Sequence, residues 1–398
     1  MSTPSALFRN ALDLNRYSNN VSRRLIESYN QIILETVREL DILGVDNDSY
    51  RAVRLRAILA QLTDSLNGWT GQSISVLAEE LTGLAEIQSS VAVENLRRVL
   101  PSGSESMVNT VAVSPEFARS VVTIDPMQTN IAVLSDELRA VPSTFNLTAR
   151  QGAVITLPGG GTVQKSFRGL TEKSAAQFAQ VVRNGMLTGE TTDQIARKLK
   201  GSLSFGQRAS ARQYIQAGGQ VTGLANRQTM ALVRTVTNQV STAASQAVYS
   251  ANRRVAPQYR YSATLDSRTS AICRDLDGQV FDEGKGPLPP QHFNCRSAIV
   301  PVVDFKGLGL EPPPEGMRAS AFGLVPADTT YPEWIYDMRN TPEGKSEIQA
   351  AFRSKSPYFL YLANKYGPKQ AISKFVRDDG SEVTLKQLRK LYPDAKAT

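Results

Sequence analysis

Sulfur and imidazole side chains are scarce in this sequence, which has 2 Cys and 1 His among 398 residues. Two cysteines are too few for the disulfide framework of a small secreted protein. One histidine is too few for an HNH-type nuclease, which normally uses more than one. A Ser-His-Asp triad would have to use His292, and the G-x-S-x-G motif that often accompanies such a triad is missing.

Long apolar runs are also missing. None approaches the roughly 18 residues that a membrane-spanning helix needs. The first residues, M-S-T-P-S-A-L-F-R-N, lack a signal-peptide core followed by a cleavage site. We therefore expect a protein that is made and kept in a cytoplasm, without a membrane partner. In that reducing compartment the two cysteines would be thiols or metal ligands.

Lysine is absent until Lys165, and the positive charge is unevenly distributed. Residues 1–100 contain ten Arg and twelve Asp/Glu, a net charge of −2, whereas residues 165–260 contain fourteen Lys/Arg and three Asp/Glu, a net charge of +11. Such a segment suits contact with phosphate groups or an acidic protein surface, and a solvated helical face is the alternative. The candidate nucleic-acid contacts are Arg197, Lys198, Lys200, Arg208, Arg212, Arg253 and Arg254.

The first hundred residues have helical periodicity. Apolar residues recur at spacings of three and four from Leu25 to Leu40, which predicts one long helix that ends near Gly44. Two further helices are predicted over about residues 53–66 and 74–96. Short connections between the three favour an antiparallel bundle.

The following residues, to about 168, combine short apolar runs with turn-forming residues. The segment A-V-I-T-L-P-G-G-G-T-V-Q-K-S-F predicts a β-hairpin that turns between Pro158 and Gly161. Helices are predicted to resume at about Thr171, with a Thr-capped helix in T-T-D-Q-I-A-R-K-L and a longer one near residues 226–252. A strand follows, with Tyr259 and Tyr261 on the same side.

Together these patterns predict an α+β protein that is predominantly helical. An N-terminal helical bundle and a small β insert precede long helices, which lead into a compact α/β domain. Three consecutive prolines, Pro312 to Pro314, mark a linker to a tail. The predicted divisions are residues 1–100, 101–168, 169–310 and 311–398.

Cys273, His292 and Cys295 are the three rare residues, and all lie within 23 positions. Thiolate and imidazole groups are ligands that Zn²⁺ prefers, so the cluster predicts a structural zinc site. A closed site has four ligands, and the fourth would be water or a nearby carboxylate. The candidate carboxylates are Asp277, Asp275 and Asp266.

Other interpretations of the three residues remain open. The cluster could be a packed, metal-free turn in which the thiols and imidazole are simply buried. A disulfide between Cys273 and Cys295 is disfavoured by the expected compartment. A nucleophile and base pair formed by Cys273 and His292 would make the protein an enzyme, either a nuclease or a Cys-dependent hydrolase.

The segment D-S-R-T-S-A-I-C-R-D-L-D-G-Q-V-F, followed by P-P-Q-H-F-N-C-R, resembles the head-morphogenesis domain of tailed bacteriophages named after the minor head protein F of phage Mu. The resemblance covers about residues 170–390. Many family members have cysteines where this chain has Ser270 and Ser297. The matching residues are Asp266, Arg268, Thr269, Leu276, Asp277, Gly278, Pro289, Pro290, His292, Asn294, Cys295 and Arg296.

The resemblance implies a minor head protein of a tailed phage and not an enzyme. Such a protein would be assembled in the bacterial host cytoplasm and located in the virion, at the portal vertex or the inner capsid face. Its implied partners are the portal protein, the major capsid or scaffolding protein, and double-stranded DNA bound without sequence preference. A part in DNA packaging or delivery would follow from that location.

Overall fold

The computed structural model describes residues 3–43, 49–110, 147–148, 152–153, 157–158, 161–314 and 316–396. Helices make up 66% of the structure and the strands form small antiparallel sheets, which confirms the predominantly helical α+β class. Within those ranges, no helix combines the length and the apolar character needed to cross a membrane.

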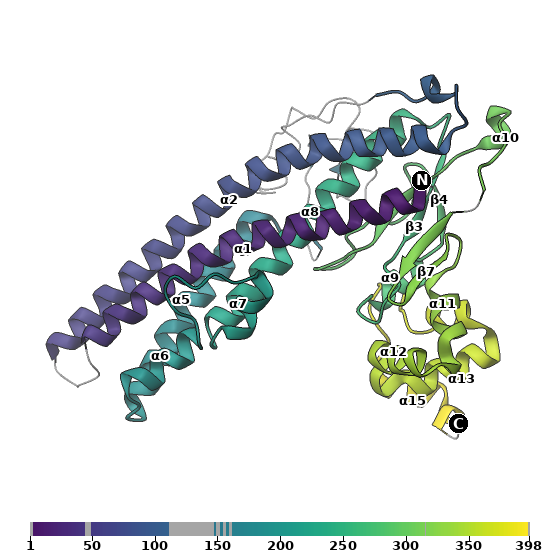
Figure 1. Cartoon of the computed structure of the whole chain (residues 1–398). Helices are drawn as coiled ribbons and strands as arrows, with labels where there is room; N and C mark the ends of the chain where they lie inside the picture. The colour runs from purple at the N-terminus through teal and green to yellow at the C-terminus, as the bar shows by residue number, and fades with distance from the viewer. Residues whose placement is uncertain are drawn as a thin grey trace.

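Two long helices, α1 (Thr3–Leu43) and α2 (Ser49–Val99), form an antiparallel pair that runs along the molecule (Figure 1). At 51 residues α2 is about 77 Å long. Tyr29 of α1 packs edge-on against Trp69 of α2, and the Trp69 indole donates a hydrogen bond to the carbonyl of Leu25. The predicted long first helix is therefore confirmed.

The predicted break between the second and third helices is wrong, because α2 is continuous through Gly68 and Gly71. Each glycine costs a helix about 1 kcal/mol relative to alanine. Leu62, Leu66 and Trp69 continue the buried stripe into this stretch, and each is at most 3% exposed. Burial of that stripe against neighbouring helices outweighs the unfavourable local propensity.

Four helices follow and pack beside this pair. In α8 the predicted apolar face is buried, including Val236, Val240 and Ala244. One hydrophobic core joins α1 and α2 to α5, α6, α8 and the strand after α8. The bounds are α5 (Val163–Leu187), α6 (Thr192–Lys200), α7 (Ala211–Ala217) and α8 (Thr222–Ala251).

The predicted hairpin around Pro158 is wrong in its second arm, because that arm forms the first turns of α5. Thr162 caps the helix by accepting a hydrogen bond from the Lys165 backbone N–H at 3.1 Å. Val163 and Phe167 then share the buried face of α5. Residues 154–156 and 159–160 of the predicted hairpin lie outside the described ranges. The short strands before them are β1 (Leu147–Thr148) and β2 (Gly152–Ala153), which pair antiparallel.

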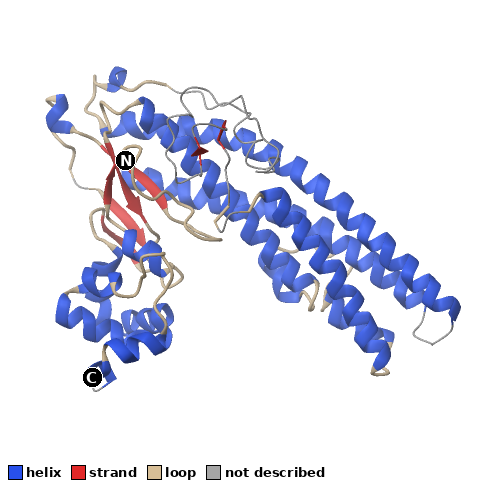
Figure 2. Cartoon of the chain, turned by 180° about the vertical axis from the view of Figure 1, so that it is seen from behind, coloured by secondary structure: helices blue, strands red, loops and turns tan. Residues whose placement is uncertain are grey.

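A three-stranded antiparallel sheet lies at one end of the helices (Figure 2). Its central strand is β3 (Gln258–Ser262), between β4 (Val280–Asp282) and β5 (Ala298–Val302). Tyr259 and Tyr261 of β3 are fully buried, as their alternation predicted. The loop between β4 and β5 contains His292 and Cys295.

The C-terminal part has its own hydrophobic core, in which the rings of Phe352 and Phe359 stack at 4.3 Å. It lies beyond the sheet, at the opposite end from α6 (Figure 1). Its elements, after α10 (Phe305–Leu308), are β6 (Met317–Ser320), β7 (Gly323–Pro326), α11 (Tyr331–Asp337), α12 (Pro342–Phe352), α13 (Ser356–Tyr366), α14 (Pro368–Ser373) and α15 (Leu385–Leu391), with 3-10 turns at Met338–Asn340, Arg353–Lys355 and Pro393–Lys396.

Candidate metal centre and basic surface

The structure brings Cys273, His292 and Cys295 together. Cys273 lies on the short helix α9 (Ala271–Leu276), and the other two lie in the loop between β4 and β5. The Cys273 Sγ is 3.4 Å from the His292 Nε2 and 3.7 Å from the Cys295 Sγ. All three potential ligand atoms lie within 4.8 Å of one another. Two separate segments of backbone, α9 and the β4–β5 loop, therefore meet at one group of side chains.

Helix α8 holds the loop in place. The Asn238 side-chain amide donates hydrogen bonds to the carbonyls of Cys295 and Ser297, at 2.7 and 3.1 Å. Thr235 accepts a hydrogen bond from the backbone N–H of Asn294, which has a φ of 61°. Asparagine tolerates this left-handed conformation better than most residues. The loop is thus anchored from α8 as well as through its thiol and imidazole groups.

The titratable groups of the cluster influence one another. The hydrogen bond with Cys295 and burial raise the pKa of the Cys273 thiol. The hydrogen bond with Cys273 lowers the pKa of the Cys295 thiol, burial opposes this, and His292 lowers it further, so the net direction is downward. Burial lowers the pKa of His292, but Cys295 and the Phe293 carbonyl raise it above its ordinary value. Cys295 is thus the thiol that ionises more readily.

The distances from Cys273 to the other two donors match those of a zinc site. Zn–S bonds of about 2.3 Å at tetrahedral angles place two sulfurs about 3.8 Å apart, and a sulfur and a nitrogen about 3.6 Å apart. The corresponding distances from Cys273 are 3.7 and 3.4 Å. The His292 Nδ1 lies 2.8 Å from the Phe293 carbonyl. Donation of a proton from Nδ1 to that carbonyl would leave the Nε2 lone pair free for a metal.

The structure does not bring Asp277 to the thiols. Its carboxylate accepts hydrogen bonds from the backbone N–H groups of Ala263 and Tyr331, both at 2.6 Å, and pairs with the Arg318 guanidinium at 3.1 Å. Burial raises the pKa of this carboxyl, although Arg318 acts in the opposite direction. Asp277 therefore links the sheet to the C-terminal part and is not placed as a fourth ligand.

The other two candidate carboxylates are also engaged elsewhere. Asp266 forms a bidentate pair with Arg296, with both distances 2.6 Å, and a further pair with Arg268. Asp275 accepts a hydrogen bond from Ser373 at 2.5 Å. Among the described residues, the group with metal-ligand geometry contains only the two cysteines and the histidine. A bound zinc would leave its fourth position to water.

Arg318 is a further residue of this region that the sequence did not indicate. It comes from β6, 41 residues after Asp277, and reaches across to this carboxylate and to the Ala263 carbonyl. No motif surrounds it in the sequence, so only the folded chain places it. Its side chain is 12% exposed, and that of Asp277 is 0% exposed.

The predicted nucleic-acid contacts form two separate groups. Asn226, near the start of α8, donates a hydrogen bond to the Tyr214 carbonyl of α7. The first group, which lies on α6, on α7 and between them, is therefore at that end of α8. The second group follows the last residue of α8, and 30 helical residues span about 45 Å. The first group is Arg197, Lys198, Lys200, Arg208 and Arg212, and the second is Arg253 and Arg254.

Not all of these cations are equally available. Lys198 pairs with Glu190 at 2.5 Å, and the Lys200 ammonium donates to the Leu203 carbonyl at 2.8 Å. Arg197, Arg208 and Arg212 are exposed, and none of them has a charged partner among the described residues. We call these three arginines the basic tip.

Residues 176–300 match the family model described as phage Mu protein F like protein. These residues form a phage Mu F-like domain. It includes most of α5, all of α6–α9, the sheet as far as Val300, and all three members of the Cys/His group. The match confirms the resemblance carried by the D-S-R-T and P-P-Q-H-F-N-C-R motifs. No curated protein and no solved structure matches the chain.

The match relates residues 176–300 to a family of phage head morphogenesis proteins. That assignment favours a structural role over an enzymatic one. Burial argues in the same direction, because Cys273 and Cys295 are only 1% and 3% exposed. A nucleophilic thiol needs access to its substrate, and both cysteines are buried in this structure.

Proposed function

We propose that this protein is a minor head protein of a tailed bacteriophage that acts at the portal vertex or the inner capsid face during procapsid assembly. The observation that carries the proposal is the Mu F-like match at residues 176–300. The helices extend well beyond the matched residues, since α1 and α2 pack along α8. They offer a long surface for the portal protein and for the major capsid or scaffolding protein.

Contact with packaged DNA is the second part of the proposal. The basic tip carries three exposed guanidinium groups, and Arg253 and Arg254 lie exposed at the other end of α8. Arginines bound to phosphates release condensed counterions, so the affinity is independent of sequence and falls with salt. The two groups would contact DNA at separate points, because about 45 Å of helix lies between them.

A salt titration tests the DNA contact. We expect log Kobs for a 30-base-pair duplex, followed by fluorescence anisotropy, to fall linearly with log salt at a slope of about −0.9 for each phosphate contacted. Replacing Arg197, Arg208 and Arg212 by Gln should reduce that slope by about 2.7. Arg16→Gln, an exposed change on α1, is the matched control.

DNA binding that does not depend on salt concentration, or no binding at low salt, would overturn the electrostatic argument.

The assembly role has a separate test, because it does not require DNA. Co-expression with the portal protein encoded by the same phage should recover a complex on size-exclusion chromatography. The assembly role would be contradicted if the two proteins eluted separately and procapsids contained none of this protein.

A further inference from the structure

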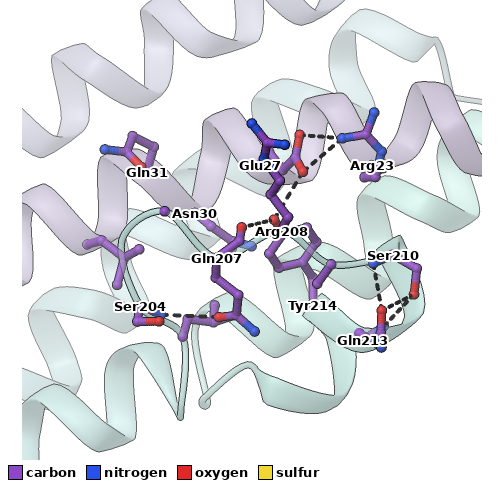
Figure 3. A pocket seen from close by; sticks show the side chains of 14 residues that line it. Arg23, Glu27, Asn30, Gln31, Ser204, Gln207, Arg208, Ser210, Gln213 and Tyr214 are labelled. Atoms are coloured by element: carbon purple, nitrogen blue, oxygen red, sulfur yellow. Dashed lines mark hydrogen bonds and ion pairs between the residues drawn. The ribbon is translucent and has the colours of Figure 1, made fainter.

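A pocket with both polar and apolar lining lies between α1 and the segment that joins α6 to α7. Its volume is about 850 Å³. One wall comes from α1, which lies outside the Mu F-like match, and the other from residues inside the match (Figure 3). The pocket therefore exists only because the N-terminal helix packs against the Mu F-like domain. The polar lining residues used below are Arg23, Glu27, Asn30, Gln207, Arg208 and Tyr214.

The α1 wall contains an amide without a partner. Asn30 is 3% exposed, and neither its Oδ1 nor its Nδ2 has a hydrogen-bond partner among the described residues. An unsatisfied buried polar group costs about 1–3 kcal/mol. A ligand group that offers both a donor and an acceptor would recover that energy. A peptide unit has this pair of groups.

The opposite wall is held in shape by hydrogen bonds. The Tyr214 hydroxyl bonds to the Gln207 carbonyl at 2.6 Å and to the Glu27 carboxylate at 3.0 Å, which ties the segment to α1 (Figure 3). Glu27 is also paired with Arg23 at 2.8 Å. A wall fixed in this way needs little reorganisation when a ligand enters, so less binding energy is lost to ordering.

Arg208 is the cation of the pocket that lacks a partner. It has no hydrogen bond or ion pair among the described residues, and it is exposed at the pocket lining. With Arg23 and Glu27 the lining carries two positive charges and one negative charge, a net of +1. A single carboxylate would balance that charge, and guanidinium groups bind carboxylates in a bidentate manner.

We propose that this pocket binds a segment of a partner polypeptide that carries an Asp or Glu side chain. The carboxylate pairs with Arg208, and a peptide unit of the same segment meets the Asn30 amide. Leu34 and Leu203 supply apolar lining beside these polar groups. The proposal shares Arg208 with the DNA contact but needs neither Arg197 nor Arg212, so variants at those two positions distinguish the two.

Duplex DNA fits this pocket poorly. Its phosphates lie on the outside of a wide cylinder and cannot approach an amide that is 3% exposed. A single unstacked base needs an aromatic face to stack on. The aromatic residue of the lining, Tyr214, is 3% exposed, and its hydroxyl is already engaged. A peptide segment is narrow enough to enter and needs no stacking partner.

A selection from two peptide libraries tests the proposal with the full-length protein. Both libraries are acetylated pentapeptide amides with randomised flanks, one with a central Glu and the other with a central Gln. Bound peptides are counted by mass spectrometry. We expect the Glu library to be enriched at least tenfold over the Gln library, and Arg208→Gln to abolish that preference. Arg212→Gln removes an equal charge outside the pocket and should leave it unchanged.

Asn30→Leu separates binding from folding. Removal of an unsatisfied buried amide should leave the melting temperature equal to or above that of the wild type, while the enrichment falls at least fivefold. Equal enrichment of the two libraries would overturn the proposal, as would equal losses in Arg208→Gln and Arg212→Gln. The pocket would be a nucleic-acid site instead if single-stranded poly-dT released the peptides and Asn30→Leu left the preference for the Glu library unchanged.

Discussion

At the scale of single residues, the side chains of Cys273, His292 and Cys295 hold two backbone segments together. They join α9 to the loop before β5, and Tyr261 packs in the same small cluster, with its hydroxyl 3.3 Å from the Cys273 sulfur. Two thiols and an imidazole packed this closely either bind a metal ion together or pack against one another in a metal-free turn. The distances from Cys273 suit either arrangement, because they are also the lengths of hydrogen bonds between its thiol and the other two groups.

Metal content tests that choice. We expect protein purified without chelators to contain about one zinc per chain, and His292→Ala to lose it, because three protein ligands hold the ion. Asp277→Asn should retain the zinc, since its carboxylate is bonded elsewhere. The measurement is inductively coupled plasma mass spectrometry. Less than about 0.2 equivalents in the wild type would support the metal-free turn.

The pair of Asp277 and Arg318 makes a second prediction at this scale. Asp277→Asn leaves a guanidinium without its counter-charge in a buried site, which should destabilise the C-terminal part by about 3 kcal/mol. Replacing Arg318 by Met in the same chain should recover part of the loss. Trp334 reports on this region in a Trp69→Phe background, so urea unfolding followed by fluorescence measures the effect. A loss below about 1 kcal/mol would show that the pair is not coupled to the tail.

The sequence predicted the Cys/His group because these residues are rare and occur close together. It could not identify the role of Asp277, since a carboxylate near thiols in sequence is an equally good metal ligand or ion-pair partner. The deciding residue, Arg318, lies 41 positions away on β6. Whether a carboxylate binds a metal or pairs with an arginine depends on contacts between distant segments. The spacing of residues in the sequence carries no information on those contacts.

At the scale of elements, regular apolar spacing predicted the long helices and the alternation of β3. The prediction failed where a local signal conflicted with packing. Two helices were predicted over about residues 53–66 and 74–96, yet the buried stripe of α2 continues through Gly68 and Gly71 between them. Thr162 and Val163 suited a strand, yet the threonine caps α5. In both places a hydrophobic face outweighed propensities of about 1 kcal/mol or less.

Two glycines of α5 provide a matched test of how closely α5 and α6 pack. A Cβ at Gly185 would lie 2.4 Å from the Ile195 Cγ1, whereas a Cβ at Gly169 meets nothing within 4 Å. We expect Gly185→Ala to destabilise the protein by about 1–3 kcal/mol and Gly169→Ala to stabilise it by up to about 1 kcal/mol. Thermal unfolding followed by Trp69 fluorescence measures both, because Phe167 of α5 packs on Trp69. Shifts of the same sign would contradict this packing.

At the scale of the whole molecule, the helices and the C-terminal part lie on either side of the small sheet (Figure 1). The basic tip lies near the end of α8 that is away from the sheet, and residues 176–300 include both that tip and most of the sheet. Two recognition surfaces, one for DNA phosphates and one for an acidic segment, would then lie near one end of α8. A protein of this kind could contact a protein shell and packaged DNA at once.

The fate of the protein during infection tests the head assignment most directly. Procapsids and mature virions of the phage that encodes it are purified by density gradient, and the protein is quantified against the major capsid protein by mass spectrometry. The account predicts that it is present in procapsids at a few copies for every hundred or more capsid subunits. Its absence from both particles, with all of it in the free protein fraction, would contradict a role as a minor head protein.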